Sequence, residues 1–194
     1  MTSVLQQLRT ETAHQHQALE NTMPFAALMT DRFSVSMYQD VLLTLRAFHG
    51  AILEVTQQVP THPITAMLNA SAVCEALDTD LLALDATSAP AFVNDQRITS
   101  QRTDIIACGY VWLGSSMGAK MIYRWLQNNA IASLPKHYYQ TLSGCSQHWA
   151  AYRRYVDALT LSVQEGEQIC RSANALFSGL RNTAGKLITD TQTA

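Results

Sequence analysis

The chain has 194 residues, of which 47% are hydrophobic and only 14% are charged, and its formal net charge at pH 7 is -2. This length suits one domain with a substantial core, and the balanced charge excludes the basic surface that nucleic-acid binding needs. So few charges predict a chain that buries much of its surface or keeps an apolar cavity.

Apolar residues recur with the helical period of about 3.6 residues, and clear strand alternation is absent. The sequence therefore predicts a protein made of helices. In chain order, we expect helices over residues 3–22, 36–58, 72–84, 102–129, 136–143, 147–159 and 163–180. Residues 85–100 carry turn formers and predict a loop, and the polar segment 182–194 is expected to fray. The expected organisation is one domain over residues 1–194.

The first predicted helix begins at Ser3, which can form a capping box with Gln6. The apolar positions of this helix leave a gap between Thr12 and Leu19, and His16 fills it. His14 lies about 200° away around the helix and should face water. His16 is therefore the histidine expected to point inward, where a neutral imidazole is a good ligand for haem iron. A core histidine bonded to a backbone carbonyl is the alternative interpretation.

Arg9 lies seven residues before His16, on the same side of the helix and about 10.5 Å along it. That spacing suits an arginine at the edge of a porphyrin whose iron binds His16, because a guanidinium can hold a propionate with two hydrogen bonds. A solvated N-terminal charge is the alternative.

Tyr110, Gly114 and Gly118 recur every four residues of the longest predicted helix and share one face. A glycine inside a helix costs about 1 kcal/mol relative to alanine. Two on one face predict either close packing of another helix or a flat ligand against bare backbone. Ser115 and Ser116 add hydroxyls near the expected cleft.

Glu11 and His14 form one ExxH motif, which a diiron protein would have to repeat on another helix. No second copy is present. The four cysteines are far apart without a CxxC pair, which argues against a zinc knuckle or a thioredoxin motif. The polar N-terminus is not a secretory signal, and no apolar run approaches the roughly 20 residues that span a bilayer. We therefore expect a reduced, cytoplasmic protein without a membrane partner.

Together these residues resemble the bacterial haem oxygenases, and the resemblance covers nearly the whole chain in order. The segment from Leu8 to His16 resembles the family's first helix, and Tyr110 to Ala119 resembles its distal helix with a GSxxG stretch. Later segments resemble its remaining helices; these are Leu134 to Tyr139, Trp149, Val156 to Leu159, and Glu167 to Phe177. The resemblance implies an all-α, single-domain haem oxygenase-like bundle.

The resemblance also implies roles for individual residues. His16 would be the proximal ligand of the haem iron, and Arg9, Tyr110 and Ser116 would bind the haem. Gly114, Ser115 and Gly118 would form the catalytic distal helix. Arg9 stands where lysine is usual, Leu113 stands where many members carry glutamate, and Ser115 replaces the mammalian aspartate. Arg171 and Arg181 are candidates for a further propionate contact.

The implied activity is oxidative cleavage of haem, which is both substrate and cofactor, to biliverdin, carbon monoxide and ferrous iron. Electrons would come from a ferredoxin or another reductase, because flavin and nicotinamide motifs are absent. Biliverdin could supply a photoreceptor, or iron could be the wanted product, and we expect a monomer. Leu113 and Ser115 keep open a haem carrier or sensor without turnover. A thiaminase-like enzyme with a cysteine nucleophile is the other alternative, since fold similarity does not decide activity.

Overall fold

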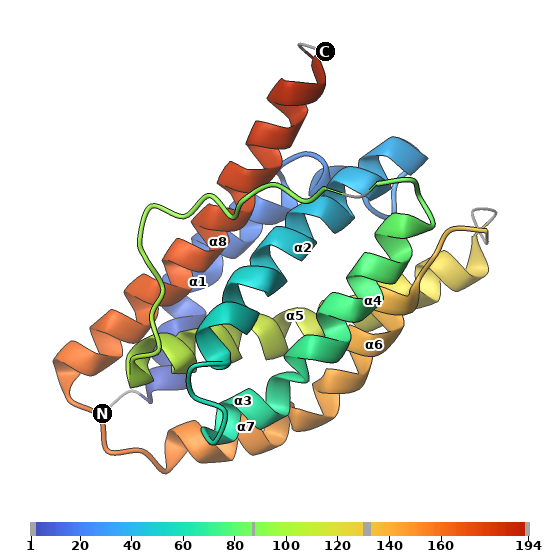
Figure 1. Cartoon of the computed structure of the whole chain (residues 1–194). Coiled ribbons are helices and arrows are strands. Elements are labelled where there is room, and N and C mark those ends of the chain that lie inside the picture. Colours follow the sequence, from blue (N-terminus) through green and yellow to red (C-terminus); the bar gives the residue numbers. More distant parts are fainter. Residues whose placement is uncertain (1–2, 87, 130–132, 193–194) are drawn as a thin grey trace.

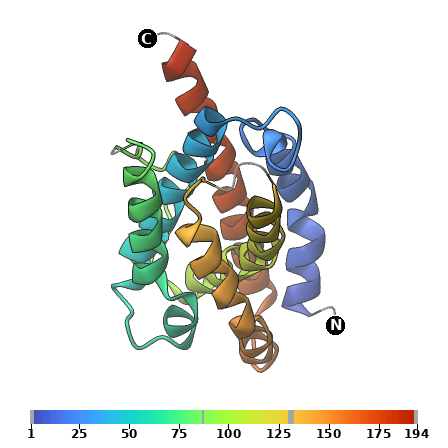
Figure 2. The ribbon, with the colours of Figure 1, turned by 90° about the vertical axis from the view of Figure 1, so that its right-hand side faces the viewer.

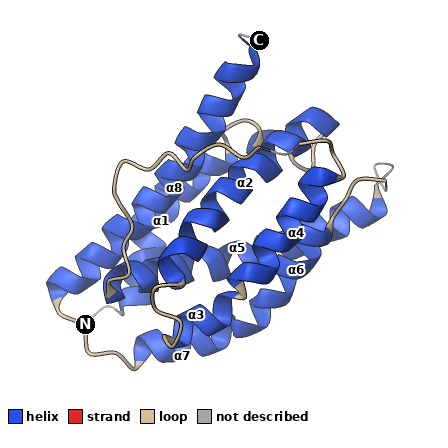
Figure 3. Cartoon of the chain, in the orientation of Figure 1, coloured by secondary structure: helices blue, strands red, loops and turns tan. Residues whose placement is uncertain are grey.

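The computed structural model describes residues 3–86, 88–129 and 133–192, and these residues form helices joined by loops, with no strand (Figure 3). The helices are α1 (Val4–Glu20), η1 (Phe25–Ala27), α2 (Val35–Thr56), α3 (Pro63–Leu68), α4 (Ala70–Leu82), α5 (Arg102–Asn128), α6 (His137–Cys145), η2 (Ser146–His148), α7 (Trp149–Asp157) and α8 (Val163–Gln192). The predicted all-α fold is confirmed.

Most predicted helices are present within two residues of their expected ends. Ser3 caps α1 as predicted, with its hydroxyl accepting the Gln6 N–H at 3.2 Å. The structure adds α3, a helix of six residues that is too short to show periodicity. Its start could be read from the local residues, because Pro63 occupies the first turn and the His62 side chain accepts the Ile64 N–H.

The last helix is longer than predicted, because α8 continues to Gln192 rather than ending near residue 180. Thr183 and Ala184 are fully buried. The loop that follows α4 lies over this part of α8, where the Val93 N–H donates to the Thr183 hydroxyl at 2.9 Å. Tertiary contacts therefore keep a polar segment helical. Figure 1 shows the last turns of α8 projecting beyond the bundle.

The first half of α5 is the centre of the core, since residues 105–108 and 111–113 are at most 3% exposed. A helix that is apolar all round is buried by its neighbours, and α5 packs against α8, α6 and α3. Figure 2 shows α5 between α1 and α6. Among the described residues, α5 is the one helix long and apolar enough to cross a membrane, and more than half of its apolar window is buried, as in a soluble core helix.

Gly109 on α5 serves close helix packing. A Cβ at this position would lie 2.7 Å from the Tyr152 ring of α7 and 2.8 Å from Ile64 of α3. Both distances are shorter than real Cβ contacts, so only glycine lets these two helices approach α5 here.

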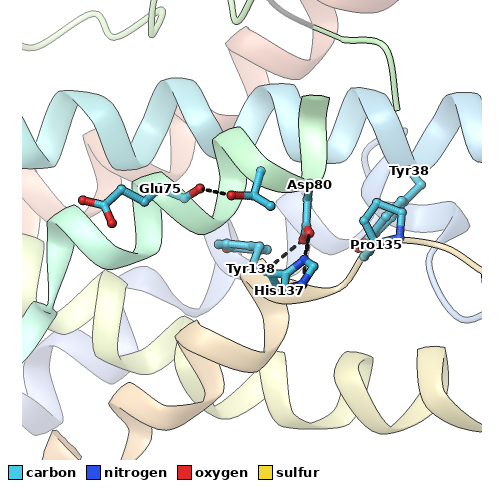
Figure 4. Close-up of polar contacts among 7 residues, drawn as sticks. Tyr38, Glu75, Asp80, Pro135, His137 and Tyr138 are labelled. Atoms are coloured by element: carbon cyan, nitrogen blue, oxygen red, sulfur yellow. Dashed lines mark hydrogen bonds and ion pairs between the residues drawn. The ribbon is translucent and has the colours of Figure 1, made fainter. Parts of the chain in front are cut away.

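Asp80 joins α4 to the start of α6, which has no side-chain cap of its own. Its side chain is fully buried, and its carboxylate accepts the backbone N–H of His137 at 3.1 Å and that of Tyr138 at 2.9 Å (Figure 4). The His137 ring Nδ1 lies 2.8 Å from the same carboxylate. A carboxylate at a helix N-terminus satisfies free N–H groups and interacts favourably with the helix dipole.

We predict that Asp80→Ala lowers the free energy of unfolding by about 2–4 kcal/mol, because it leaves buried N–H groups without an acceptor. Urea unfolding of the apoprotein measures this change. Asp78→Ala is the matched control on the same helix, since Asp78 makes an exposed ion pair with Arg46 and should cost at most about 1 kcal/mol. Equal losses for the two variants would contradict the role of Asp80.

Candidate functional site

A cavity of about 1040 Å³ opens between α1 and α5. Its volume reaches the upper end of the range of roughly 300–1,000 Å³ that is usual for small-molecule sites. Residues of α1, α5, α7 and α8 surround it, and α2 and α6 close its inner side. We call these inner residues the inner wall; they are Leu45, Phe48, Tyr138, Tyr139 and Leu142. The apolar cavity expected from the low charge content is therefore present.

His16 lies on the cavity, and His14 is exposed and does not line it. The predicted difference in direction between these two histidines agrees with the fold, but the expectation that His16 is buried is wrong. Its side chain is 56% exposed, because the cavity beside it is open. The imidazole packs edge-on against the Phe177 ring of α8, with 5.5 Å between ring centroids.

The environment of His16 leaves one ring nitrogen available to a ligand. Nδ1 lies 3.5 Å from a carboxylate oxygen of Glu20, one turn further along α1. A carboxylate near Nδ1 favours a proton on that nitrogen, and the lone pair then lies on Nε2. The His16 side chain can therefore offer Nε2 to a metal ion held in the cavity.

The two glycines on one face of α5 have empty space beside them. Gly114 and Gly118 both line the cavity, and a Cβ added to either would meet no atom within 4 Å. They therefore differ from Gly109, which the packing of α3 and α7 requires. Of the two explanations that the sequence allowed, close helix packing does not apply to Gly114 and Gly118. The bare backbone instead leaves room for a flat molecule.

The two serines that follow Gly114 differ in position. Ser115 lines the cavity, and its hydroxyl donates to the Trp112 carbonyl at 2.7 Å. Ser116 is fully buried outside the cavity lining, and its hydroxyl donates to the Leu113 carbonyl at 2.6 Å. The prediction that Ser116 binds the cofactor is therefore corrected to a structural role, because its helical phase turns it into the core.

Tyr110, in the first half of α5, also lines the cavity. Its hydroxyl lies 3.4 Å from the Thr12 hydroxyl, and Thr12 itself donates to the Leu8 carbonyl at 2.7 Å. Tyr110 is therefore the donor in the longer contact. A hydrogen bond of that length is weak, so the phenol can turn to a better acceptor in the cavity.

Two exposed arginines line the cavity, Arg9 of α1 and Arg153 of α7. Arg9 was among the residues predicted from the sequence, but Arg153 was not. The later arginines that the sequence favoured do not line the cavity. Arg171 is bonded to Gln168 on the surface of α8, and Arg181 donates to Gln15 at 3.0 Å.

A helical pattern in the sequence could have identified Arg153. Trp149, Arg153 and Asp157 are spaced four residues apart on one face of α7, and all three line the cavity. Their spacing is as regular as that of Tyr110, Gly114 and Gly118 on α5.

The cysteines do not provide a nucleophile at this site, which removes the support for a thiaminase-like enzyme. All four are buried and none lines the cavity. Burial raises the pKa of the Cys74 and Cys170 thiols to about 11. Among the described residues, no group of three or more His, Cys, Asp or Glu side chains could hold a metal ion. A metal bound in the cavity would thus need to arrive with its own ligands.

The fold and the cavity together define a helical protein with a cavity large enough for a cofactor, which contains one available histidine and a helix face bared by two glycines. The chain matches the family model described as heme oxygenase over residues 2–183, and it therefore belongs to the haem oxygenase family. Members of this family are oxidoreductases for which haem is both substrate and prosthetic group, and they need an electron donor. No curated protein sequence matches the chain.

Solved structures of bacterial haem oxygenases share this fold. The enzyme from Leptospira interrogans has a TM-score of 0.73 and 18% identity, covering 95% of this chain and 100% of that one. Haem oxygenase-1 from the cyanobacterium Synechocystis has a TM-score of 0.71 and 17% identity, covering 97% and 94%. The Neisseria meningitidis enzyme has a TM-score of 0.67 and 20% identity, covering 95% and 94%.

Proposed function

We propose that the cavity between α1 and α5 binds haem, with His16 Nε2 as the proximal ligand of the iron and the backbone at Gly114 and Gly118 on the distal side. The observation that carries this proposal is the empty space beside the two glycines, in a cavity that also contains the available histidine. Synechocystis haem oxygenase-1, which has the same fold, was solved in complex with heme.

We propose that the bound haem is cleaved to biliverdin, with release of carbon monoxide and ferrous iron, at the expense of oxygen and external electrons. A neutral imidazole ligand suits this chemistry, since a thiolate would instead favour O–O cleavage. The bare backbone at Gly114 and Gly118 would let α5 lie close to a bound ring, and this crowding would limit access to the meso carbons. Ser115 donates to the Trp112 carbonyl, so its oxygen presents lone pairs to the cavity and orders water as an acceptor.

The rotation of the ring would be fixed by its propionates. Arg9 and Tyr110 were assigned to them from the sequence, and we add Arg153 because it lines the same cavity. Arginine suits this role because its guanidinium can hold a carboxylate with two hydrogen bonds. We therefore propose Arg153, rather than Arg171 or Arg181, as the propionate contact from the C-terminal half of the chain.

We predict that Arg153→Ala keeps haemin binding but weakens it by about tenfold, as loss of one charge-assisted contact implies, and changes the ratio of biliverdin isomers. Arg9→Ala should act in the same direction. Chromatography of the product measures the isomer ratio. Arg154→Ala is the matched control, because the neighbouring arginine is exposed and does not line the cavity. An isomer ratio that changes in Arg154→Ala, or in neither of the other variants, would contradict these assignments.

We propose a ferredoxin or a comparable reductase as the electron donor, and a monomer acting in the cytoplasm. Two uses of the reaction are open, the supply of biliverdin to a photoreceptor and the release of iron. The competing proposal is a haem carrier or sensor that binds haem without turnover. Its support is Ser115, a serine at the position where a carboxylic acid could supply a proton.

Turnover separates these two proposals. The haemin complex is mixed with a ferredoxin and its reductase under air, and biliverdin and carbon monoxide are measured. About one carbon monoxide per haem, together with loss of the Soret band, is the expected result. A Soret band that persists through repeated reduction would leave the carrier or sensor.

A further inference from the structure

The side chains around the inner wall offer few protons to a bound ligand. Ser115 uses its hydroxyl proton on the Trp112 carbonyl, so the one hydroxyl that α5 can turn into the cavity is that of Tyr110, on the side that faces α1. The inner wall is apolar except for two phenols, those of Tyr138 and Tyr139. Any proton donated by a side chain from this side must come from α6.

Tyr138 is held by a histidine that the proposed function has not used. The Tyr138 hydroxyl lies 2.9 Å from Nε2 of His49 on α2, and both side chains are at most 1% exposed. The Trp112 ring of α5 lies against the imidazole, with 4.1 Å between ring centroids. Asp80 fixes the backbone N–H of Tyr138 (Figure 4), so α2, α4 and α5 all act to hold this pair in place.

Both members of the pair are neutral at physiological pH. Burial lowers the pKa of His49 to about 3, and the nearby charge of Arg46 acts in the same direction. Burial raises the pKa of the Tyr138 phenol far above its usual value. The other titratable groups around Tyr138 are Tyr38, Tyr139, Cys74 and Cys145. A neutral imidazole carries one proton, and its position decides which residue donates in the bond.

The two tautomers of His49 leave different atoms without a partner. Nδ1 has no hydrogen-bond partner among the described residues and is buried. If the proton were on Nδ1, a buried N–H would be unpaired and Tyr138 would donate to Nε2. If it is on Nε2, the imidazole donates to the Tyr138 oxygen, the Nδ1 lone pair is unpaired, and the released Tyr138 proton can turn toward the cavity that this residue lines. His49 does not line the cavity, and a buried N–H without a partner is rare in folded proteins, so the second arrangement is favoured.

We propose that His49 donates its Nε2 proton to the Tyr138 oxygen, which leaves the Tyr138 hydroxyl free to donate into the cavity. Tyr138 is then a hydrogen-bond donor of the inner wall, toward water or a ligand on the haem, and His49 is its positioning residue. The neighbouring Tyr139 hydroxyl has no partner among the described residues and no residue that orients it. This inference rests on the proposed haem site. It assigns the donation of a hydrogen bond into the cavity to Tyr138 of α6, held by His49 of α2, because Ser115 on α5 already uses its proton.

The tautomer can be measured in the apoprotein, without haem. Nitrogen-15 spectra of the histidine-labelled protein distinguish a protonated ring nitrogen from an unprotonated one, and His49→Gln identifies the signals of His49. We expect a neutral imidazole with its proton on Nε2. A proton on Nδ1 would overturn the proposal, because Tyr138 would then donate to His49 and have no proton left for the cavity.

The haemin complex provides a second readout, the pH of the acid–alkaline transition in its visible spectrum. Tyr138→Phe should raise this pH by about half to one unit, since a donated hydrogen bond favours the more negatively charged form. Tyr152→Phe is the matched control. Tyr152 is equally buried and donates to the Ile106 carbonyl at 2.9 Å, but it does not line the cavity. The control should lose similar stability and leave the transition unchanged.

The role of His49 is tested by rescue. His49→Leu removes the donor and should shift the transition as Tyr138→Phe does, whereas His49→Gln keeps an N–H and should retain the wild-type value. Equal shifts for Tyr138→Phe and Tyr152→Phe would overturn the proposal. If the wild-type protein bound no haemin, the proposed function would fail instead, and the tautomer measured in the apoprotein would still decide the arrangement of the pair.

Discussion

The variant His16→Ala is expected to lose the six-coordinate Soret spectrum of the haemin complex and to weaken haemin binding by at least about a hundredfold. The physical reason is that, among the described residues, His16 is the one histidine that lines the cavity and no cysteine lines it, so the iron would have no other imidazole or thiolate to replace the Nε2 lone pair. The apoprotein should remain as stable as the wild type, because the His16 side chain is more than half exposed. A spectroscopic haemin titration measures the affinity, and thermal unfolding measures the stability.

His14→Ala is the matched control for this variant, since His14 lies on the same helix, is exposed and does not line the cavity. It should keep the wild-type spectrum and affinity. If the two variants bound haemin equally well, the assignment of His16 as the proximal ligand would be wrong. Added imidazole should restore a histidine-like spectrum to His16→Ala by occupying the space of the missing ring.

The second large effect is expected from Gly114→Leu, which fills the space beside α5 in the cavity. A Cβ at this position meets no atom within 4 Å, and leucine is a better helix former than glycine by about 1 kcal/mol. The apoprotein should therefore be unchanged or up to about 1 kcal/mol more stable. Haemin affinity should fall at least about tenfold, because the leucine occupies the volume that the ring needs.

Gly109→Ala provides the opposite case. Its Cβ would collide with Tyr152 and Ile64, so this smaller substitution should destabilise the apoprotein by about 1–3 kcal/mol without changing the cavity. Urea unfolding and haemin titration of both variants test the distinction. Loss of stability in Gly114→Leu without loss of affinity would show that the empty space is not where the ligand lies.

The sequence predicted the long helices because their apolar residues repeat over several turns. It failed where the structure depends on contacts between distant segments. The polar end of α8 is helical because Thr183 bonds to Val93 and Ala184 is covered, and neither contact is visible in a local pattern. Short α3 has too few residues for a period, although Pro63 marks its start.

The candidate site was predicted best where one helix determines the geometry. The helical phase separated His16 from His14, and the spacing of Tyr110, Gly114 and Gly118 placed them together on one face that lines the cavity. Phase also explains the error at Ser116, which lies one residue beyond Ser115 and so turns into the core.

Residues contributed by other helices were missed, because only the folded chain brings them to the cavity. Arg153 reaches it from α7. His49 lies behind the cavity wall on α2 and bonds to Tyr138, which lines the cavity and is 89 residues away in the chain. The burial of His16 was also predicted wrongly, since a periodic pattern cannot distinguish a core position from the wall of an open cavity.

A crystal structure of the haemin complex is the measurement that tests the central claim most directly. We predict haem in the cavity between α1 and α5, with the iron bound to His16 Nε2, the ring against the backbone of Gly114 and Gly118, and the propionates toward Arg9 and Arg153. Haem bound outside this cavity, or iron bound to a residue other than His16, would contradict the account.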